Sequence, residues 1–237
     1  MNSLTTTARI TGALYLVLAV TGGLGFLLVR PAIFVPDDAS TTLTNLLAQE
    51  SLARIGIALE LLTVLSQAVL AIWFFKLFRS VNAVAATSVA AFGLVNAVAI
   101  LGSATFSSTA LAVALDPALS VAGGTAETVQ LMYQLGGTLW GVGGIFFGLW
   151  LIPMGQLVLQ SRWMPRPLGW ILIGGGIGYV ISVFATYVVP APGGVADALA
   201  IVATVGEFWM LGYLLILGVR RGATVPAAPA KEAARAS

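Results

Sequence analysis

Cysteine and histidine are both absent from this 237-residue sequence. Without cysteine the chain has no disulfide, no thiol nucleophile and no thiolate metal ligand. Without histidine it lacks the usual metal ligand and the usual base at neutral pH, so carboxylates are the only proton-transfer groups left. We therefore expect no metal and no cofactor. The sequence favours a non-enzymatic role, although acid-base chemistry on lipids stays open as an alternative.

Charged residues are scarce: they make up 8% of the chain, whereas soluble domains carry roughly a quarter. Hydrophobic residues make up 59%, and the mean hydropathy is +0.99. They fall into six blocks, each long enough to cross the roughly 30 Å hydrocarbon layer as a helix. The predicted fold is therefore all-α, a polytopic bundle of six transmembrane helices whose partner is the lipid bilayer. The net charge of +2 includes no basic patch interleaved with aromatics, which excludes nucleic acid as a partner.

The predicted spans are separated by proline-containing and polar stretches. The first is expected to stop at Arg30-Pro31, and the third at Asp116-Pro117. We expect the spans at about 8–28, 52–75, 81–115, 127–150, 168–189 and 196–219. The first is read as a retained span rather than a signal peptide. Residues 1–221 would form the membrane domain, and the Ala- and Pro-rich segment 222–237 a disordered cytoplasmic tail.

A short amphipathic helix is predicted between the first and second spans, on the extracytoplasmic bilayer surface. Asp37, Asp38 and Ser40 offer N-cap oxygens. Leu43, Leu46 and Leu47 follow them at helical spacing.

Lysines and arginines in the short loops predict the orientation. They precede the first span or follow the second, fourth and sixth spans, at Arg9, Lys76, Arg79, Arg162, Arg166, Arg220 and Arg221. All of these positions lie on one side of a six-span protein, with Arg30 and Arg54 as exceptions on the other side. By the positive-inside rule both termini are cytoplasmic.

Glycines predict which helix faces pack against protein. One face of the fourth span carries Glu127, Gln130, Gln134, Gly137, Gly141, Gly144 and Gly148. In the fifth span Gly174, Gly178 and Ser182 form a small-xxx-small seam. Because small residues let helix backbones approach closely in lipid, these two faces are expected to meet. The fourth helix is expected to kink near Pro153.

Several short motifs, in this order, resemble a known family. They are Ala8-Arg-Ile-Thr-Gly12, Ser51-Leu-Ala-Arg-Ile-Gly56, Gly148-Leu-Trp-Leu-Ile-Pro-Met-Gly155, Pro165-Arg-Pro-Leu-Gly169, Gly178-Tyr-Val-Ile-Ser182 and Gly206-Glu207. Over nearly the whole chain the sequence looks like the bacterial membrane family catalogued as domain of unknown function 4386, with Thr11 as a minor departure. The resemblance implies a multi-pass protein of the bacterial inner membrane and brings no catalytic residues with it.

Two acidic residues inside predicted spans are the principal candidates for function. Glu60 and Glu207 each lie about ten residues from the outer end of a span, which places both near the bilayer midplane at about 1.5 Å per residue. An ionised carboxylate there costs about 2.5–3.5 kcal/mol, so each should be protonated, paired or hydrated. We expect one polar pocket that both acids share across a protein-lined interior at equal depth. Its other members would be Asn96, Gln67 and Gln134, with an opening through Gln130 and Glu127.

Three functional interpretations remain open. The first is a small proton-linked transporter, or a bundle that binds a cation or amine through the two carboxyls. The second is a non-catalytic scaffold or sensor component in which the buried glutamates only hydrogen-bond helices together. The third is an enzyme acting on lipids. The substrate and the oligomeric state do not follow from the sequence.

Overall fold

The structure is a computed structural model that describes residues 3–121, 124–189 and 193–220, and helices make up nearly all of them. No strand occurs in these ranges, which confirms the all-α prediction. The α-helices are α1 (Ser3–Gly23), α2 (Arg30–Ile33), α3 (Ala39–Ala48), α4 (Glu50–Phe78), α5 (Ala83–Leu115), α6 (Thr125–Ser161), α7 (Arg166–Val188) and α8 (Gly193–Ile216). A π-helix, η1 (Leu24–Val29), joins α1 to α2, and a 3-10 turn, η2 (Pro117–Leu119), follows α5. The tail 222–237 lies outside the described residues.

Five helical segments are long and apolar enough to cross a membrane. They are Ser3–Ile33, Glu50–Phe78, Ala83–Leu115, Thr125–Ser161 and Arg166–Val188. The sixth predicted span is α8, whose 24 residues include an apolar stretch at Ile201–Ile216. A helix of 24 residues measures about 36 Å, enough to cross the hydrocarbon layer. The chain is therefore a multi-pass membrane protein, and its span count is close to the predicted six.

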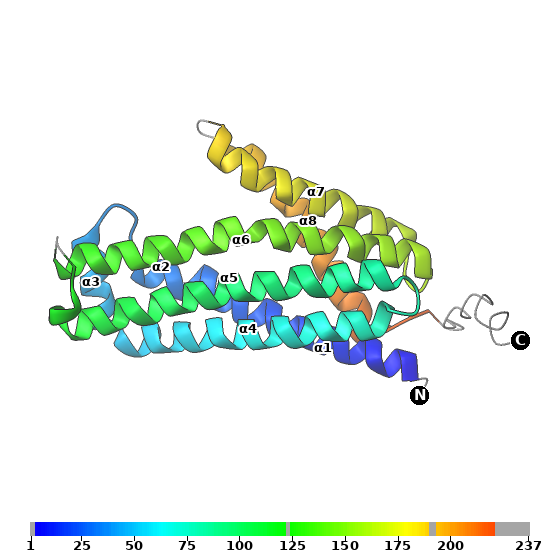
Figure 1. Ribbon diagram of the computed structural model, residues 1–237, viewed down its shortest axis with the longest axis horizontal. Coiled ribbons are helices and arrows are strands. Elements are labelled where there is room, and N and C mark those ends of the chain that lie inside the picture. Colours follow the sequence, from blue (N-terminus) through cyan, green and yellow to red (C-terminus); the bar gives the residue numbers. More distant parts are fainter. Residues whose placement is uncertain (1–2, 122–123, 190–192, 221–237) are drawn as a thin grey trace, which may run out of the picture.

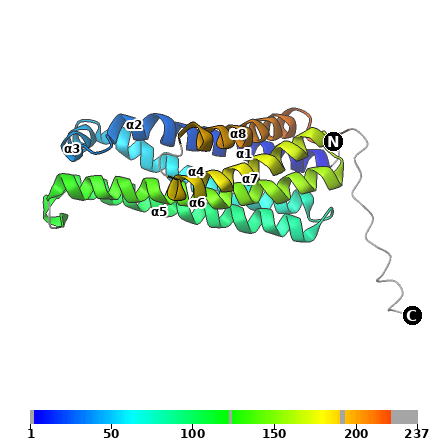
Figure 2. The same cartoon turned by 90° about the horizontal axis from the view of Figure 1, so that it is seen from above.

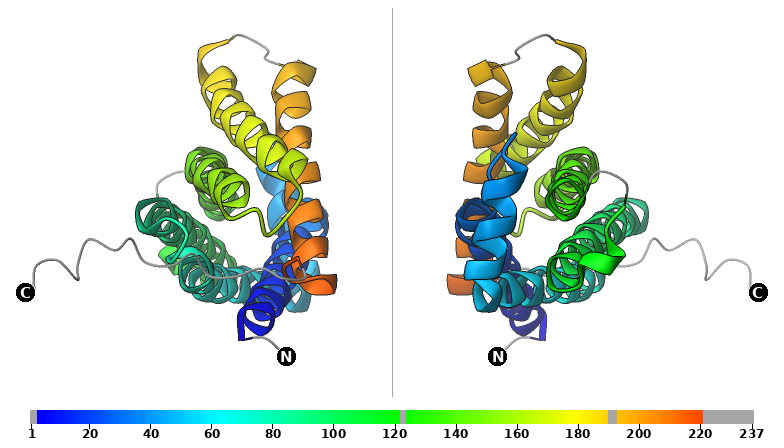
Figure 3. Two further views of the ribbon diagram at one scale, coloured as in Figure 1. Left: turned by 90° about the vertical axis from the view of Figure 1, so that its right-hand side faces the viewer. Right: turned by 90° about the vertical axis from the view of Figure 1, so that its left-hand side faces the viewer.

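The six long helices form a closed arrangement in which each packs against the next and α8 returns to α1. Figure 1 shows α3 at one end of the bundle and the first residues of α1 at the other. From above, α1 and α8 run along one side of the bundle and α5 along the other (Figure 2). The end of α7 and the start of α8 project away from the remaining helices, whereas the rest of this hairpin packs on α6 and α1 (Figure 3). Near the N-terminal end of α1, the side chain of Arg9 donates to the carbonyl of Ile216 and ties α8 to α1.

The first span does not stop at Arg30-Pro31 as predicted. The helix continues through η1 to Ile33, and the N–H of Arg30 donates to the carbonyl of Gly25, five residues earlier. Proline disrupts a regular α-helix because it lacks an N–H and its ring crowds the carbonyl four residues before it. The wider π turn locally replaces that hydrogen-bonding pattern. Arg30 therefore remains inside the helix instead of marking its end.

The short helix α3 forms where the sequence predicted it. Asp38 is its N-cap, and its carboxylate accepts a hydrogen bond from the N–H of Thr41 at 2.9 Å. Thr42 and Leu46 are fully buried against the bundle. The helix is therefore packed onto the protein through one face.

Glycines allow close contact of α6 with α7 and of α7 with α8. A Cβ on Gly155 would lie 2.4 Å from the carbonyl oxygen of Gly169, and one on Gly148 would lie 2.9 Å from that of Gly176. A Cβ on Gly175 would lie 2.6 Å from the Cα of Ala203. At these positions only glycine permits the observed separation of the backbones.

The glycines of the two faces that were predicted to pack together differ in burial. Gly144 and Gly178 are buried, and a Cβ on them would meet Tyr179 and Leu199 respectively. Gly174 and Gly141 are exposed, and no atom lies within 4 Å of a Cβ built on Gly174.

The last seam glycine, Gly137, faces the guanidinium of Arg30 rather than α7. Pro153 lies within α6, which is assigned as helix without a break across it.

Candidate functional site

Glu207 of α8 contacts α1 through a single hydrogen bond. Its Oε1 accepts the hydroxyl proton of Tyr15, with an oxygen–oxygen distance of 2.5 Å. No lysine or arginine within the described residues lies within 4 Å of this carboxylate. The ring of Tyr15 is fixed in turn by edge-on contacts with Phe74 and Trp150. Packing of α1 thus positions the hydrogen-bond donor of Glu207.

A cavity of about 290 Å³ lies beside Glu207. Its lining comes from five helices and is mostly apolar. The polar side chains that line it, apart from Tyr15 and Glu207, are Thr63, Gln67, Asn96, Trp140 and Thr204. Pockets for small ligands have this character, an apolar lining with a few polar groups that fix orientation, and their volumes begin at roughly 300 Å³.

Gln67 is the most unusual of the polar residues in this lining. It is 0% exposed, and neither its amide nitrogen nor its amide oxygen has a hydrogen-bond partner in the structure. Buried polar groups are nearly always hydrogen-bonded, and an unmet one costs about 1–3 kcal/mol. Gln67 therefore carries an amide without a hydrogen-bond partner next to this cavity.

Glu60 of α4 has partners on two other helices. Its Oε1 accepts from the hydroxyl of Ser103 at 2.9 Å and from the indole N–H of Trp140 at 3.2 Å. Its Oε2 is buried without a hydrogen-bond partner. This carboxylate therefore links α4 to α5 and α6 with one oxygen and leaves the other oxygen unmet.

Arg30 lies near Glu60, and the sequence analysis did not identify it as a site residue. Its guanidinium donates to the carbonyl of Tyr133 at 2.6 Å and lies 5.0 Å from the ring centroid of Phe34. The rings of Tyr133 and Phe26 lie 5.7 and 5.9 Å away. The Arg-Pro pattern suggested a helix end, and only the π turn places this arginine inside the bundle.

Arg30 and Glu60 line a second, smaller cavity of about 30 Å³. The two side chains do not form a direct ion pair, because no nitrogen–oxygen distance between them is 4.0 Å or less. Ser107 and Tyr133 are the other polar residues of the lining.

The two glutamates therefore belong to two cavities, which corrects the prediction of one pocket at a single depth. Gly25 lines the cavity of Glu60 and lies ten residues from Tyr15, about 15 Å along the helix at 1.5 Å per residue. Glu60 is ten residues from the start of α4, whereas Glu207 is fourteen from the start of α8. Trp140 connects the two sites, since it donates to Glu60 and lines the cavity of Glu207.

Some of the remaining predicted site residues line a cavity and others do not. Gln67 and Asn96 line the cavity of Glu207 as expected of pocket residues. The amide nitrogen of Gln130 donates to the carbonyl of Val35 at 3.1 Å, outside both cavities. Gln134 and Glu127 are exposed and line neither cavity.

A family model described as Domain of unknown function (DUF4386) matches residues 10–218. The chain belongs to this family. No curated protein and no solved structure matches it. Membership accordingly agrees with the predicted resemblance and assigns no activity to the DUF4386 chain.

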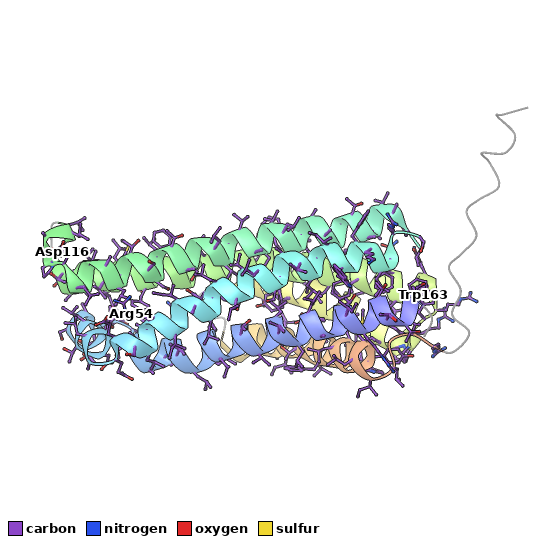
Figure 4. All side chains as sticks on the ribbon, turned by 90° about the horizontal axis from the view of Figure 1, so that it is seen from below. Arg54, Asp116 and Trp163 are labelled. Atoms are coloured by element: carbon purple, nitrogen blue, oxygen red, sulfur yellow. The ribbon has the colours of Figure 1, made fainter. Side chains whose placement is uncertain are left out.

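Other charged groups of this DUF4386 protein, such as Arg54, Glu50 and Asp116, lie toward one end of the bundle. Arg54 pairs with Glu50 one turn earlier, at 2.7 Å, and both side chains are substantially exposed. Figure 4 shows Arg54 and Asp116 near the α3 end and Trp163 at the opposite end. Within the described residues no group of three acidic side chains could hold a metal ion. Within the described residues, the two cavities bring polar side chains together with open space between the helices.

Proposed function

We propose that this DUF4386 chain binds a small amphipathic amine in the cavity of Glu207. The carrying observation is a carboxylate in a largely apolar cavity that has no cationic partner within 4 Å among the described residues. An ammonium group would supply the missing positive charge, and an apolar body would occupy the rest of the space. The buried amide of Gln67 would accept one N–H of the ligand.

The cost of charge inside the membrane supports a cationic ligand. An ionised carboxylate at this depth costs about 2.5–3.5 kcal/mol, and the hydroxyl of Tyr15 meets only one of its oxygens. Glu207 would therefore hold a proton while the cavity is empty and release it when an ammonium binds. Exchange of a proton for a cation at one carboxyl is the chemistry that a proton-linked transporter needs.

We propose that the protein lies in a bacterial inner membrane, and the charge distribution supports cytoplasmic termini. Lys76, Arg79, Arg162 and Arg166 fall at or between helix ends on the side where α1 begins. Asp116 lies toward the other end, near α3 (Figure 4). Positive loops remain on the cytoplasmic side.

A structural role for the acids is the alternative function. It is favoured by the hydrogen bonds that each acid already makes, from Tyr15 to Glu207 and from Ser103 and Trp140 to Glu60. In that case the cavity would bind amines no better than neutral molecules of the same shape.

Binding of phenethylamine and of its uncharged analogue 2-phenylethanol to protein in nanodiscs separates the two functions. The proposal expects the amine to bind at least about tenfold more tightly, a difference of about 1.4 kcal/mol. Glu207→Gln should abolish that preference. Glu127→Gln, which removes an exposed carboxyl outside both cavities, should retain it. Equal binding of amine and alcohol by the unmodified protein, or a preference that survives Glu207→Gln, would support the structural role.

A further inference from the structure

We infer that the cavity between Arg30 and Glu60 holds water that bridges the two side chains, as a hydrated ion pair separate from the amine site. This inference does not depend on the proposed function, because Glu207 does not line this cavity. The ligand is water itself, bound by one cationic and one anionic side chain inside the bundle.

The space and the unmet polar atom both point to water. One water molecule needs a cavity volume of about 10–15 Å³, and this cavity has a volume of about 30 Å³. Glu60 lines this cavity, and its Oε2 is buried and has no protein donor. An internal water molecule typically makes about three hydrogen bonds. Glu60, Arg30, Ser107 and Tyr133 offer that number of partners around one small volume.

Arg30 is held in place by contacts other than Glu60. The carbonyl of Tyr133 and the faces of Phe26, Phe34 and Tyr133 surround its guanidinium. Arg30 and Glu60 line the same cavity. Because the arginine does not come within ion-pair distance, the buried carboxylate oxygen lacks compensation for its lost hydration. Water supplies the missing hydrogen bonds and transmits the interaction between the two charges.

The lining also shows which end of the bundle the cavity is closer to. Ile33 ends α2, and Ala53 lies three residues from the start of α4, both at the α3 end of the bundle, while Gly25 and Glu60 lie deeper. The cavity thus extends from the region of α3 toward Glu60. Water held here would hydrate Glu60 and leave its hydrogen bond to Trp140 in place.

Silver ions added to cysteine variants test this inference, because Ag⁺ is small enough to follow water and replaces the thiol proton as RS–Ag. The native chain has no cysteine, so a single introduced thiol is the only reactive one. Gly25→Cys places the thiol at the cavity, where a Cβ would meet only Leu59 at an ordinary 3.5 Å. Leu28→Cys is the control. Leu28 is 63% exposed on the outer face of η1 and lies nearer to the α3 end.

The expected result in nanodiscs is that Ag⁺ blocks G25C at least about tenfold faster than L28C, since thiols in water ionise and thiols in lipid do not. Adding Glu60→Gln should slow the reaction of G25C, because the only carboxylate lining the cavity is removed. Ile57→Cys with Ile55→Cys as its control repeats the comparison on α4, should G25C fail to fold. Equal rates within the pairs, or a G25C rate unchanged by Glu60→Gln, would overturn the hydrated ion pair.

Discussion

The indole N–H of Trp140 donates to Oε1 of Glu60 at 3.2 Å, while the same indole lines the cavity of Glu207. Its ring also packs against Phe26, with centroids 5.0 Å apart. One side chain of α6 therefore separates the two acidic sites and contacts both. Anything that alters the hydrogen bonding of Glu60 can move one boundary of the neighbouring cavity.

Replacing Trp140 with phenylalanine should destabilise the protein because it removes a donor from a carboxylate and keeps most of the aromatic surface. We expect the free energy of unfolding to fall by about 1.5–3 kcal/mol, the usual range for hydrogen bonds to charged groups. Denaturant unfolding in detergent measures this change. Trp170→Phe is the control, because Trp170 is 64% exposed. Equal effects of the two substitutions would contradict the role of the Trp140 hydrogen bond.

Alanine substitutions at two adjacent glycines of α7 should have opposite effects on the stability of the protein. Gly175→Ala forces a Cβ to within 2.6 Å of the backbone of Ala203, and such overpacking typically costs about 1–3 kcal/mol. Gly174→Ala meets no atom within 4 Å and should be neutral or stabilise the helix by about 0.5–1 kcal/mol. Thermal unfolding of the two variants in the same detergent checks this. A larger loss in Gly174→Ala would disprove the observed packing of α7 on α8.

Arg30 and Glu60 should be energetically coupled although they do not touch. Arg30→Met leaves the carboxylate without its nearby cation, and Glu60→Leu leaves a half-buried guanidinium without its anion. The double variant should lose less stability than the sum of the single variants, with a coupling of about 0.5–3 kcal/mol. A double-mutant cycle of unfolding free energies measures it. Simple additivity would show that the two charges do not interact through the cavity.

The N-cap of α3 should make that helix sensitive to acid. Hydrogen bonds from the hydroxyl and N–H of Thr41 and from the hydroxyl of Ser40 lower the pKa of Asp38 below its usual 3.8. The cap therefore contributes its full stability above the unfolded pKa of about 3.9, and this contribution falls away as the pH drops through the lower folded value. The protection of the α3 amides against hydrogen exchange, relative to the intrinsic rate at each pH, should fall in that range. Asp38→Ala should exchange quickly at neutral pH, whereas Asp38→Asn should remain protected because its side-chain oxygen still caps the helix. Equal protection of all three proteins would contradict the capping role.

Helical spacing in the sequence places Asn82, Ala85, Val89, Gly93, Asn96, Ser103 and Ser107 on one face of the third span. All of them except Asn82, the N-cap of α5, are buried. The fourth span has 37 residues and meets different neighbours along its length, so a single sequence stripe could not describe it. Gly143 of this helix faces Ala99 of α5, whereas Gly148 faces α7. Gln134, which lies nearer the start of the helix, is exposed.

The sequence carried no signal for the two structural features that place Glu60 and Glu207 in different cavities. A π turn adds a residue to one turn of helix and changes the direction of every later side chain. Arg30 is therefore internal although it precedes a proline, and it faces the cavity of Glu60. The tilt of the α7 and α8 hairpin, set by glycine contacts with other helices, brings Glu207 to Tyr15 rather than to Glu60.

Infrared difference spectroscopy of the carboxyl groups, recorded as phenethylamine is added to protein in nanodiscs, tests the central claim most directly. The account predicts that one protonated carboxyl C=O band disappears on binding, that Glu207→Gln removes this change, and that Glu60→Gln retains it. Two results would contradict the assignment of the amine to the cavity of Glu207. One is loss of the band in both the unmodified protein and Glu207→Gln, and the other is a band change that disappears in Glu60→Gln instead.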